Sequence, residues 1–86
     1  MRLDKYLKVS RIIKRRTVAS DAADSQKILV NGNIAKPSKD IKVNDIITIN
    51  YFKKRLVVEV LDIKDNIKAS EADKMYKVIE MVDNEH

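Results

Sequence analysis

The chain has 86 residues, of which 44% are hydrophobic and 36% are charged, and its net charge is +5. This size and balance predict one small folded domain and exclude a disordered chain. Because the sequence contains no cysteine, disulfides and thiolate metal sites are excluded, which fits a cytoplasmic protein, and the apolar runs are too short for a membrane span.

Positive charge is concentrated in the N-terminal third of the chain. Residues 1–36 carry nine Lys and Arg against three Asp, a net charge of +6. Residues 37–86 carry nine Lys and Arg against ten Asp and Glu, a net charge of −1. Such a one-sided distribution indicates a polyanionic partner.

Residues 1–16 predict a basic amphipathic helix, in which Leu3, Tyr6 and Leu7 share an apolar face. A solvated surface helix is the plain alternative. Three consecutive cations at the end of the segment exceed what a helix dipole requires, so an RNA-binding face is favoured. The cations of this segment are Arg2, Lys5, Lys8, Arg11, Lys14, Arg15 and Arg16.

Residues 17–26 predict a second helix, with the Thr17 hydroxyl as its N-terminal cap. The free amides of this helix end would lie beside Arg15 and Arg16, where a phosphate could be held.

Residues 28–34 predict a hairpin, because Asn31 and Gly32 lie between apolar residues and both accept a positive φ. Lys27 and Lys36 flank this hairpin. A purely structural turn and a direct RNA contact are both open for Asn31 and Gly32.

Two further strands are predicted at residues 46–52 and 55–63, which extends the hairpin to an antiparallel sheet of three to four strands. For residues 55–63 the pattern does not decide which side is buried. The turn at residues 53–55 is favoured as a solvated hairpin tip over an RNA contact.

Residues 70–82 predict an amphipathic C-terminal helix, because apolar residues recur there at helical spacing. Ser70 and Asp73 resemble a capping box at its start. The apolar stripe would pack on the sheet, and binding of a protein partner is the alternative.

The segments RLDKYLK at residues 2–8, Arg16-Thr17, Val30-Asn31-Gly32 and Lys36-Pro37-Ser38 resemble the S4 RNA-binding domain over about residues 1–50. The resemblance implies an α+β fold of the S4 type (αL), with two N-terminal helices on the small antiparallel sheet, plus the C-terminal helix. It divides the chain into an S4 domain at residues 1–64 and a C-terminal helical extension at residues 65–86. Gln26 and Asn44 stand where the family usually has Gly.

Charge pattern and resemblance together predict one RNA-binding surface on the helices and the hairpin turn. Its expected residues are Arg2, Lys5, Lys8, Arg11, Lys14, Arg15, Arg16, Thr17, Lys27, Asn31, Gly32 and Lys36. Tyr6 lies on the apolar helix face and Tyr51 and Phe52 lie elsewhere, so we expect recognition of structured RNA by its shape and not by base stacking.

Length and the C-terminal segment narrow the resemblance to small stand-alone bacterial S4 proteins, the heat-shock protein 15-like family that includes factors of ribosome quality control. This implies a monomer that binds large-subunit rRNA and tRNA on the 50S subunit. It also implies RqcH as a partner during alanine tailing of stalled chains. A ribosome-assembly factor, or another factor that binds structured RNA, is the alternative.

Catalysis is not expected. His86 is the sole histidine and Gly32 the sole glycine, so neither a histidine-based catalytic site nor a glycine-rich cofactor loop can be built from this sequence. We expect no cofactor and no metal. A basic helix that binds a membrane surface or DNA is the remaining alternative, although the apolar face lacks the bulky aromatics that membrane binding favours.

Overall fold

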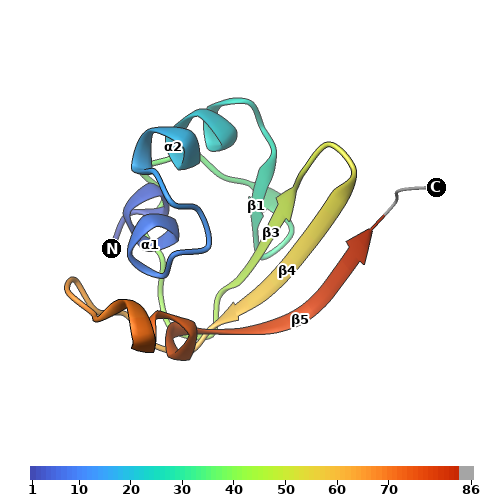
Figure 1. Cartoon of the computed structure of the whole chain (residues 1–86). Coiled ribbons are helices and arrows are strands. Elements are labelled where there is room, and N and C mark those ends of the chain that lie inside the picture. Colours follow the sequence, from blue (N-terminus) through green and yellow to red (C-terminus); the bar gives the residue numbers. More distant parts are fainter. Residues whose placement is uncertain (84–86) are drawn as a thin grey trace.

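The computed structural model describes residues 1–83 and has two layers, with helices on one face of an antiparallel sheet (Figure 1). The helices are α1 (Leu3–Val9), α2 (Arg16–Asp24) and the 3-10 helix η1 (Ala69–Met75). The strands are β1 (Ile28–Val30), β2 (Asn33–Ile34), β3 (Ile46–Asn50), β4 (Lys54–Val60) and β5 (Tyr76–Asp83), in the order β2-β1-β3-β4-β5. The predicted α+β class is confirmed, with five strands where three to four were expected.

The core lies between the sheet and the two N-terminal helices. Leu56, Val58 and Val60 of β4 are buried, and the residues between them are only half-buried. Because side chains alternate along a strand, this pattern resolves which side of residues 55–63 faces inward. Tyr6 of α1, with no exposed surface, belongs to the same core cluster, as expected from the helical wheel.

Helix α1 is shorter than predicted and ends at Val9, not near Arg16. Ser10 is buried, and its hydroxyl donates to the carbonyl oxygen of Leu7 at 3.3 Å. Arg11 follows with φ of 64°, and the Ile13 amide then donates to the same Leu7 oxygen at 3.0 Å. The left-handed residue turns the chain so that Ile13 returns to the core, which makes residues 11–15 a loop.

Helix α2 begins one residue earlier than predicted, and Thr17 does not cap it. The N-cap is Arg15, in extended conformation and without a side-chain capping bond, so Thr17 lies exposed inside the first turn. The capping function assigned to Thr17 is therefore wrong.

The hairpin predicted at Asn31-Gly32 is confirmed. Strands β1 and β2 pair antiparallel, with Val30 opposite Asn33, and the two turn residues have φ of 52° and 84°. These values are those that a two-residue hairpin turn of type I′ requires.

The prediction of a helix over residues 70–82 is wrong for most of its length. Residues 69–75 form η1, whose N-cap Lys68 makes no side-chain capping bond, so the capping box of Ser70 and Asp73 is also wrong. Residues 76–83 form β5, which pairs with β4 and contains a bulge opposite Val57 and Val58. Residues 84–86 of the predicted C-terminal extension lie outside the described residues, and the domain division at residue 64 stays a prediction.

None of the helices within residues 1–83 is long and apolar enough to cross a bilayer.

Candidate nucleic-acid interface

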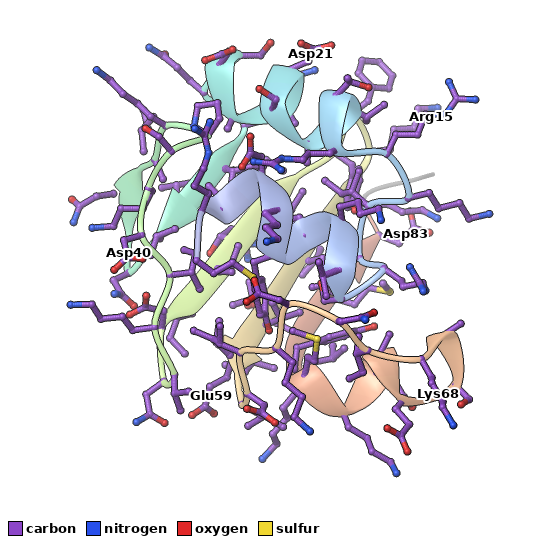
Figure 2. All side chains as sticks on the ribbon, turned by 90° about the vertical axis from the view of Figure 1, so that its left-hand side faces the viewer. Arg15, Asp21, Asp40, Glu59, Lys68 and Asp83 are labelled. Carbon is purple, nitrogen blue, oxygen red and sulfur yellow. The ribbon has the colours of Figure 1, made fainter. Side chains whose placement is uncertain are left out.

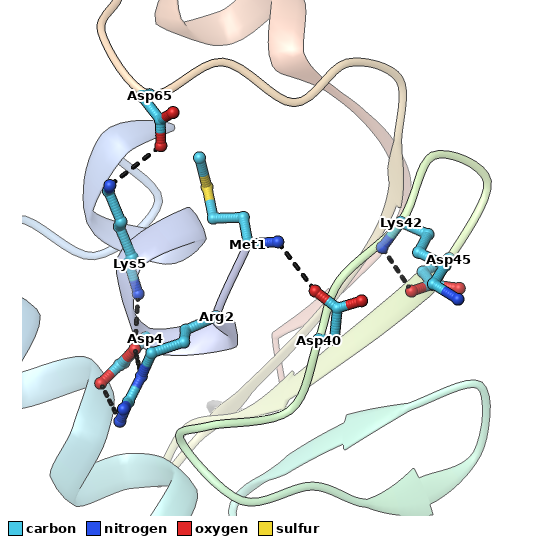
Figure 3. A network of polar contacts seen from close by, with 8 residues as sticks. All are labelled: Met1, Arg2, Asp4, Lys5, Asp40, Lys42, Asp45 and Asp65. Carbon is cyan, nitrogen blue, oxygen red and sulfur yellow. Dashed lines mark hydrogen bonds and ion pairs between the residues drawn. The ribbon is translucent and has the colours of Figure 1, made fainter.

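A buried carboxylate joins two of the predicted RNA-binding arginines. The Asp4 side chain is 5% exposed and accepts hydrogen bonds from Arg2 Nε at 3.2 Å and Arg2 Nη2 at 3.3 Å (Figure 3). Its Oδ1 atom also lies 3.4 Å from Arg16 Nη2 and accepts from the Lys5 backbone amide at 2.8 Å. One side chain of α1 thereby holds an arginine that precedes α1 beside the first residue of α2. We call Arg2, Asp4 and Arg16 the arginine clamp.

The arginine clamp keeps Asp4 ionised. Burial by itself raises the pKa of Asp4, but the hydrogen bonds from the Arg2 side chain and the Lys5 amide, with the charges of Arg16 and Arg2, outweigh it and lower the pKa. Two guanidinium groups then face one carboxylate, which leaves a net positive charge. The Arg2 and Arg16 side chains stay 53% and 47% exposed, so their remaining donors are accessible to a phosphate.

Backbone contacts to residues 37–41 fix the start of the chain, and thus the position of Arg2. The Leu3 amide donates to Lys39 O at 2.8 Å, and the Ile41 amide donates to Met1 O at 2.7 Å. The N-terminal ammonium donates to Asp40 Oδ1 at 2.8 Å, and this bond lowers the pKa of Asp40 (Figure 3).

Four further cations are fully available on the surface. Lys8, Arg11, Lys14 and Arg15 are exposed, and within residues 1–83 their side chains make no hydrogen bond or ion pair. Figure 2 shows Arg15 projecting outward where the loop enters α2. Because no intramolecular pair has to be broken, these side chains can turn toward an anion at little cost.

Lys5 departs from the predicted set. It is half-buried, and its Nζ atom donates to Asp65 Oδ1 at 2.9 Å in the segment between β4 and η1 (Figure 3). This contact lowers the pKa of Asp65. The Lys5 ammonium is therefore turned toward the C-terminal segment, away from Arg2, although such a solvated pair is weak enough to open for a phosphate.

The Asn31 side chain has a structural role in the β1–β2 hairpin. Its Oδ1 atom accepts from the Ile46 amide at 2.9 Å, and its Nδ2 atom donates to Asp45 Oδ1 at 3.0 Å. The Asn31 side chain thus joins the hairpin to the start of β3, which favours the structural role for this residue. Gly32, at the tip, keeps an exposed backbone.

Lys36 and Lys27 lie beside different surface hollows. A hollow of about 370 Å³ between the β1–β2 hairpin and the loop after it is lined in part by Lys36 and Lys39. Lys27 lines another hollow, together with Val18 and Tyr51. The predicted residues thus fall on the two arginines of the clamp, the loop 11–15, the hairpin region and the two helices, where Lys8 and Thr17 are exposed, with Lys5 and Lys27 to their sides.

Asp4 is absent from the predicted set, although it is the one acidic residue of the segment RLDKYLK. A single acidic residue in a strongly basic segment was the available signal. Within residues 1–83, no group of three or more His, Asp or Glu side chains could hold a metal ion.

This chain resembles known proteins in sequence and in structure. The S4 domain family matches residues 1–47. The RQC P-site tRNA stabilizing factor of Streptococcus pneumoniae is 58% identical over 79 residues, covering 92% of this chain and 90% of that protein. The protein of the same name from Bacillus subtilis is 49% identical over 79 residues, covering 92% of each chain. A trimeric structure of heat shock protein 15 from Vibrio cholerae matches with a TM-score of 0.82 and 31% identity, covering 91% of this chain and 80% of that one.

These two sequence relatives and the structural match each cover at least 91% of this chain, whereas the S4 family model covers residues 1–47. This chain therefore belongs to the S4-domain family that includes the RQC P-site tRNA stabilizing factors.

Proposed function

We propose that this chain is a non-catalytic RNA-binding adaptor of ribosome quality control. It binds the large ribosomal subunit through rRNA and the tRNA in the P site, as a cytoplasmic monomer. It acts there with RqcH while alanine tails are added to stalled nascent chains. The observation that carries the proposal is the 58% identity, over 92% of the chain, to a protein named for stabilising P-site tRNA.

The arginine clamp supplies a mechanism for such binding. Arg2 and Arg16 are held by Asp4 but half-exposed, so their guanidinium groups meet phosphates without first losing much side-chain freedom. The unpaired cations of the loop 11–15 add charge that releases counterions from RNA. Phosphate contacts of this kind set the position of the protein on folded RNA.

Arg16→Ala tests the clamp against a matched surface change. We expect about tenfold weaker binding to purified 50S subunits carrying peptidyl-tRNA, since a charge-assisted contact contributes about 1.5 kcal/mol or more. Lys68→Ala removes the same charge from the far end of the molecule (Figure 2) and should bind as the unaltered protein does. Binding is measured by co-sedimentation, and thermal melting checks that both variants fold.

Equal binding by Arg16→Ala and Lys68→Ala would contradict the proposed surface.

The role in quality control has its own readout in cells that lack this chain. Loss of alanine tails from a stalled reporter protein, with normal large subunits on gradients, is the expected result. Accumulation of immature large subunits with unchanged tailing would instead indicate an assembly factor.

A further inference from the structure

An apolar groove with a lysine rim borders the cationic surface. One hollow, of about 750 Å³, is lined by residues that include Leu56, Met81 and Lys54, and a second, of about 320 Å³, by residues that include Val18 and Lys27. Both hollows are also lined by Ile12, Tyr51 and Phe52, so they adjoin each other at these three residues. We call the two together the hairpin groove, because the β3–β4 hairpin forms one of its sides. Its larger part has the volume typical of ligand pockets, roughly 300–1,000 Å³.

The hairpin groove presents an aromatic ring that the fold does not use. Phe52 is 95% exposed at the tip of the hairpin. The backbone on both sides of the tip is nevertheless held, because the Tyr51 amide donates to Lys54 O at 2.7 Å and the Asn50 amide donates to Lys27 O at 2.8 Å. The second bond holds Lys27 beside the hairpin. An exposed ring between held backbone segments is a platform on which a flat group can stack with little ordering cost.

The charge of the groove selects the kind of group. Its lining contains three lysines and, among the described residues, no carboxylate. The Lys53 ammonium lies 5.9 Å from the centre of the Phe52 ring, at a distance typical of a cation–π contact. An occupant that is flat, partly apolar and negatively charged fits this lining, and a nucleotide has all three properties.

We propose that the hairpin groove binds an unpaired RNA nucleotide, with its base stacked on Phe52 and its phosphates near Lys27 and Lys54. From the sequence we expected Tyr51 and Phe52 to lie away from the RNA surface. The structure instead places them across the groove from Val18 of α2, the helix that begins at Arg16. A base extruded from RNA bound on the helices can therefore reach the groove. The inference rests on the proposed function and adds stacking to an otherwise electrostatic contact.

Substitutions at Phe52 test the stacking contact. We expect Phe52→Ala to weaken binding to a fluorescein-labelled single-stranded oligoadenylate by roughly 5- to 150-fold, the range for loss of one base–aromatic contact. Phe52→Trp should retain the affinity, because its ring also stacks. Phe52→Leu, which is apolar but has no ring face, should behave like Phe52→Ala. Fluorescence anisotropy reports binding, and thermal melting should be unchanged because the side chain is 95% exposed.

The same proteins are compared on purified 50S subunits beside Arg16→Ala. Weaker binding by both Phe52→Ala and Arg16→Ala supports the stacked nucleotide. Weaker binding by Arg16→Ala alone overturns it and leaves the proposed function intact, whereas failure of the unaltered protein to bind 50S subunits overturns the proposed function. Full binding by Phe52→Leu also overturns the stacked nucleotide, and would identify the groove as a site for an apolar protein segment.

Discussion

Among single residues, Asp4 is the least expected in the proposed RNA-binding surface, because a carboxylate repels phosphate. The contacts of Asp4 with Arg2 and Arg16 explain its presence. Without Asp4, the two guanidinium groups of Arg2 and Arg16 would repel each other and move independently. With it, their approach is set before RNA arrives, at the cost of one negative charge that is 5% exposed. The carboxylate therefore acts as a positioning group in this surface.

Asp4→Asn should destabilise the protein in a pH-dependent way. At neutral pH we expect a loss of about 1–3 kcal/mol in the free energy of unfolding, because charge-assisted hydrogen bonds from both arginines are weakened. The folded-state pKa of Asp4 is lowered, so its ionised form stabilises the protein above the unfolded pKa of about 4, and this contribution is lost as the pH falls below that value. Urea denaturation at neutral and acidic pH measures both effects.

The control for this experiment is Asp21→Asn, an exposed change on α2 (Figure 2). It should have little effect at either pH. A stability difference between Asp4→Asn and the unaltered protein that stays constant from neutral to acidic pH would refute the ionised clamp.

Residues with a positive φ show which backbone turns could be predicted from the sequence and which could not. The positive φ of Asn31 and Gly32 could be predicted, because Asn-Gly between apolar residues is a strong hairpin signal. Gln26 and Arg11 also have positive φ, of 62° and 64°, although neither residue type favours it. For Gln26 the available signal is the resemblance to the S4 domain, which implies glycine at this position.

Among the helices and strands, Arg11 and Gln26 mark the helix ends, because each turns the chain just beyond the last residues of α1 and α2. The Gln26 amide donates to Ala23 O and the Lys27 amide to Ala22 O, both at 3.0 Å, which is the Schellman arrangement at the end of a helix. Arg11 follows α1 in a similar way. Glycine normally marks this position, and the chain has one glycine, which is elsewhere. The end of α1 at Val9 therefore depends on packing of Ser10 and Ile13 and could not be predicted from local signals.

The error over β5 has a different cause. Ala72, Met75, Ile79 and Val82 recur at helical spacing, but the same segment holds β-branched residues that suit a strand. The free edge of β4 decides between the two, because pairing along Tyr76–Asp83 satisfies its backbone groups. Such a long-range contact is absent from any local pattern. The arginine clamp could not be predicted for the same reason, because Arg16 meets Asp4 only when α1 and α2 pack together.

Tyr6→Phe tests the attachment of the C-terminal segment to α1. The Tyr6 hydroxyl donates to Met75 O at 2.7 Å, and both residues are fully buried. That oxygen also accepts from the Leu61 amide at 2.8 Å, so it keeps a partner in the variant. We therefore expect a modest loss of about 1 kcal/mol in the free energy of unfolding, measured with urea.

Tyr51→Phe is the matched control for this variant, because Tyr51 is 43% exposed and should tolerate loss of its hydroxyl. Binding to 50S subunits should be unchanged in Tyr6→Phe. Identical stability of the two variants would show that the Tyr6 hydroxyl does not hold the C-terminal segment.

At the scale of the whole molecule, charge and architecture are divided along the chain. The first 36 residues carry a net charge of +6 and contain both α-helices and the β1–β2 hairpin. The remainder is close to neutral and supplies three of the five strands and η1. The sheet thus acts as a platform that fixes the cationic elements, and the exposed loop cations extend the surface of the clamp.

This division predicts a steep salt dependence of RNA binding. Each phosphate neutralised releases counterions, so the logarithm of the affinity for 50S subunits should fall linearly with the logarithm of the salt concentration. Arg16→Ala should reduce the magnitude of the slope by about one, because one phosphate contact is lost. Lys68→Ala should leave the slope unchanged, since that lysine lies beside η1 at the other end of the molecule (Figure 2). Equal slopes for all three proteins would mean that Arg16 meets no phosphate, and a flat slope for the unaltered protein would mean that the cationic elements do not form the RNA-binding surface.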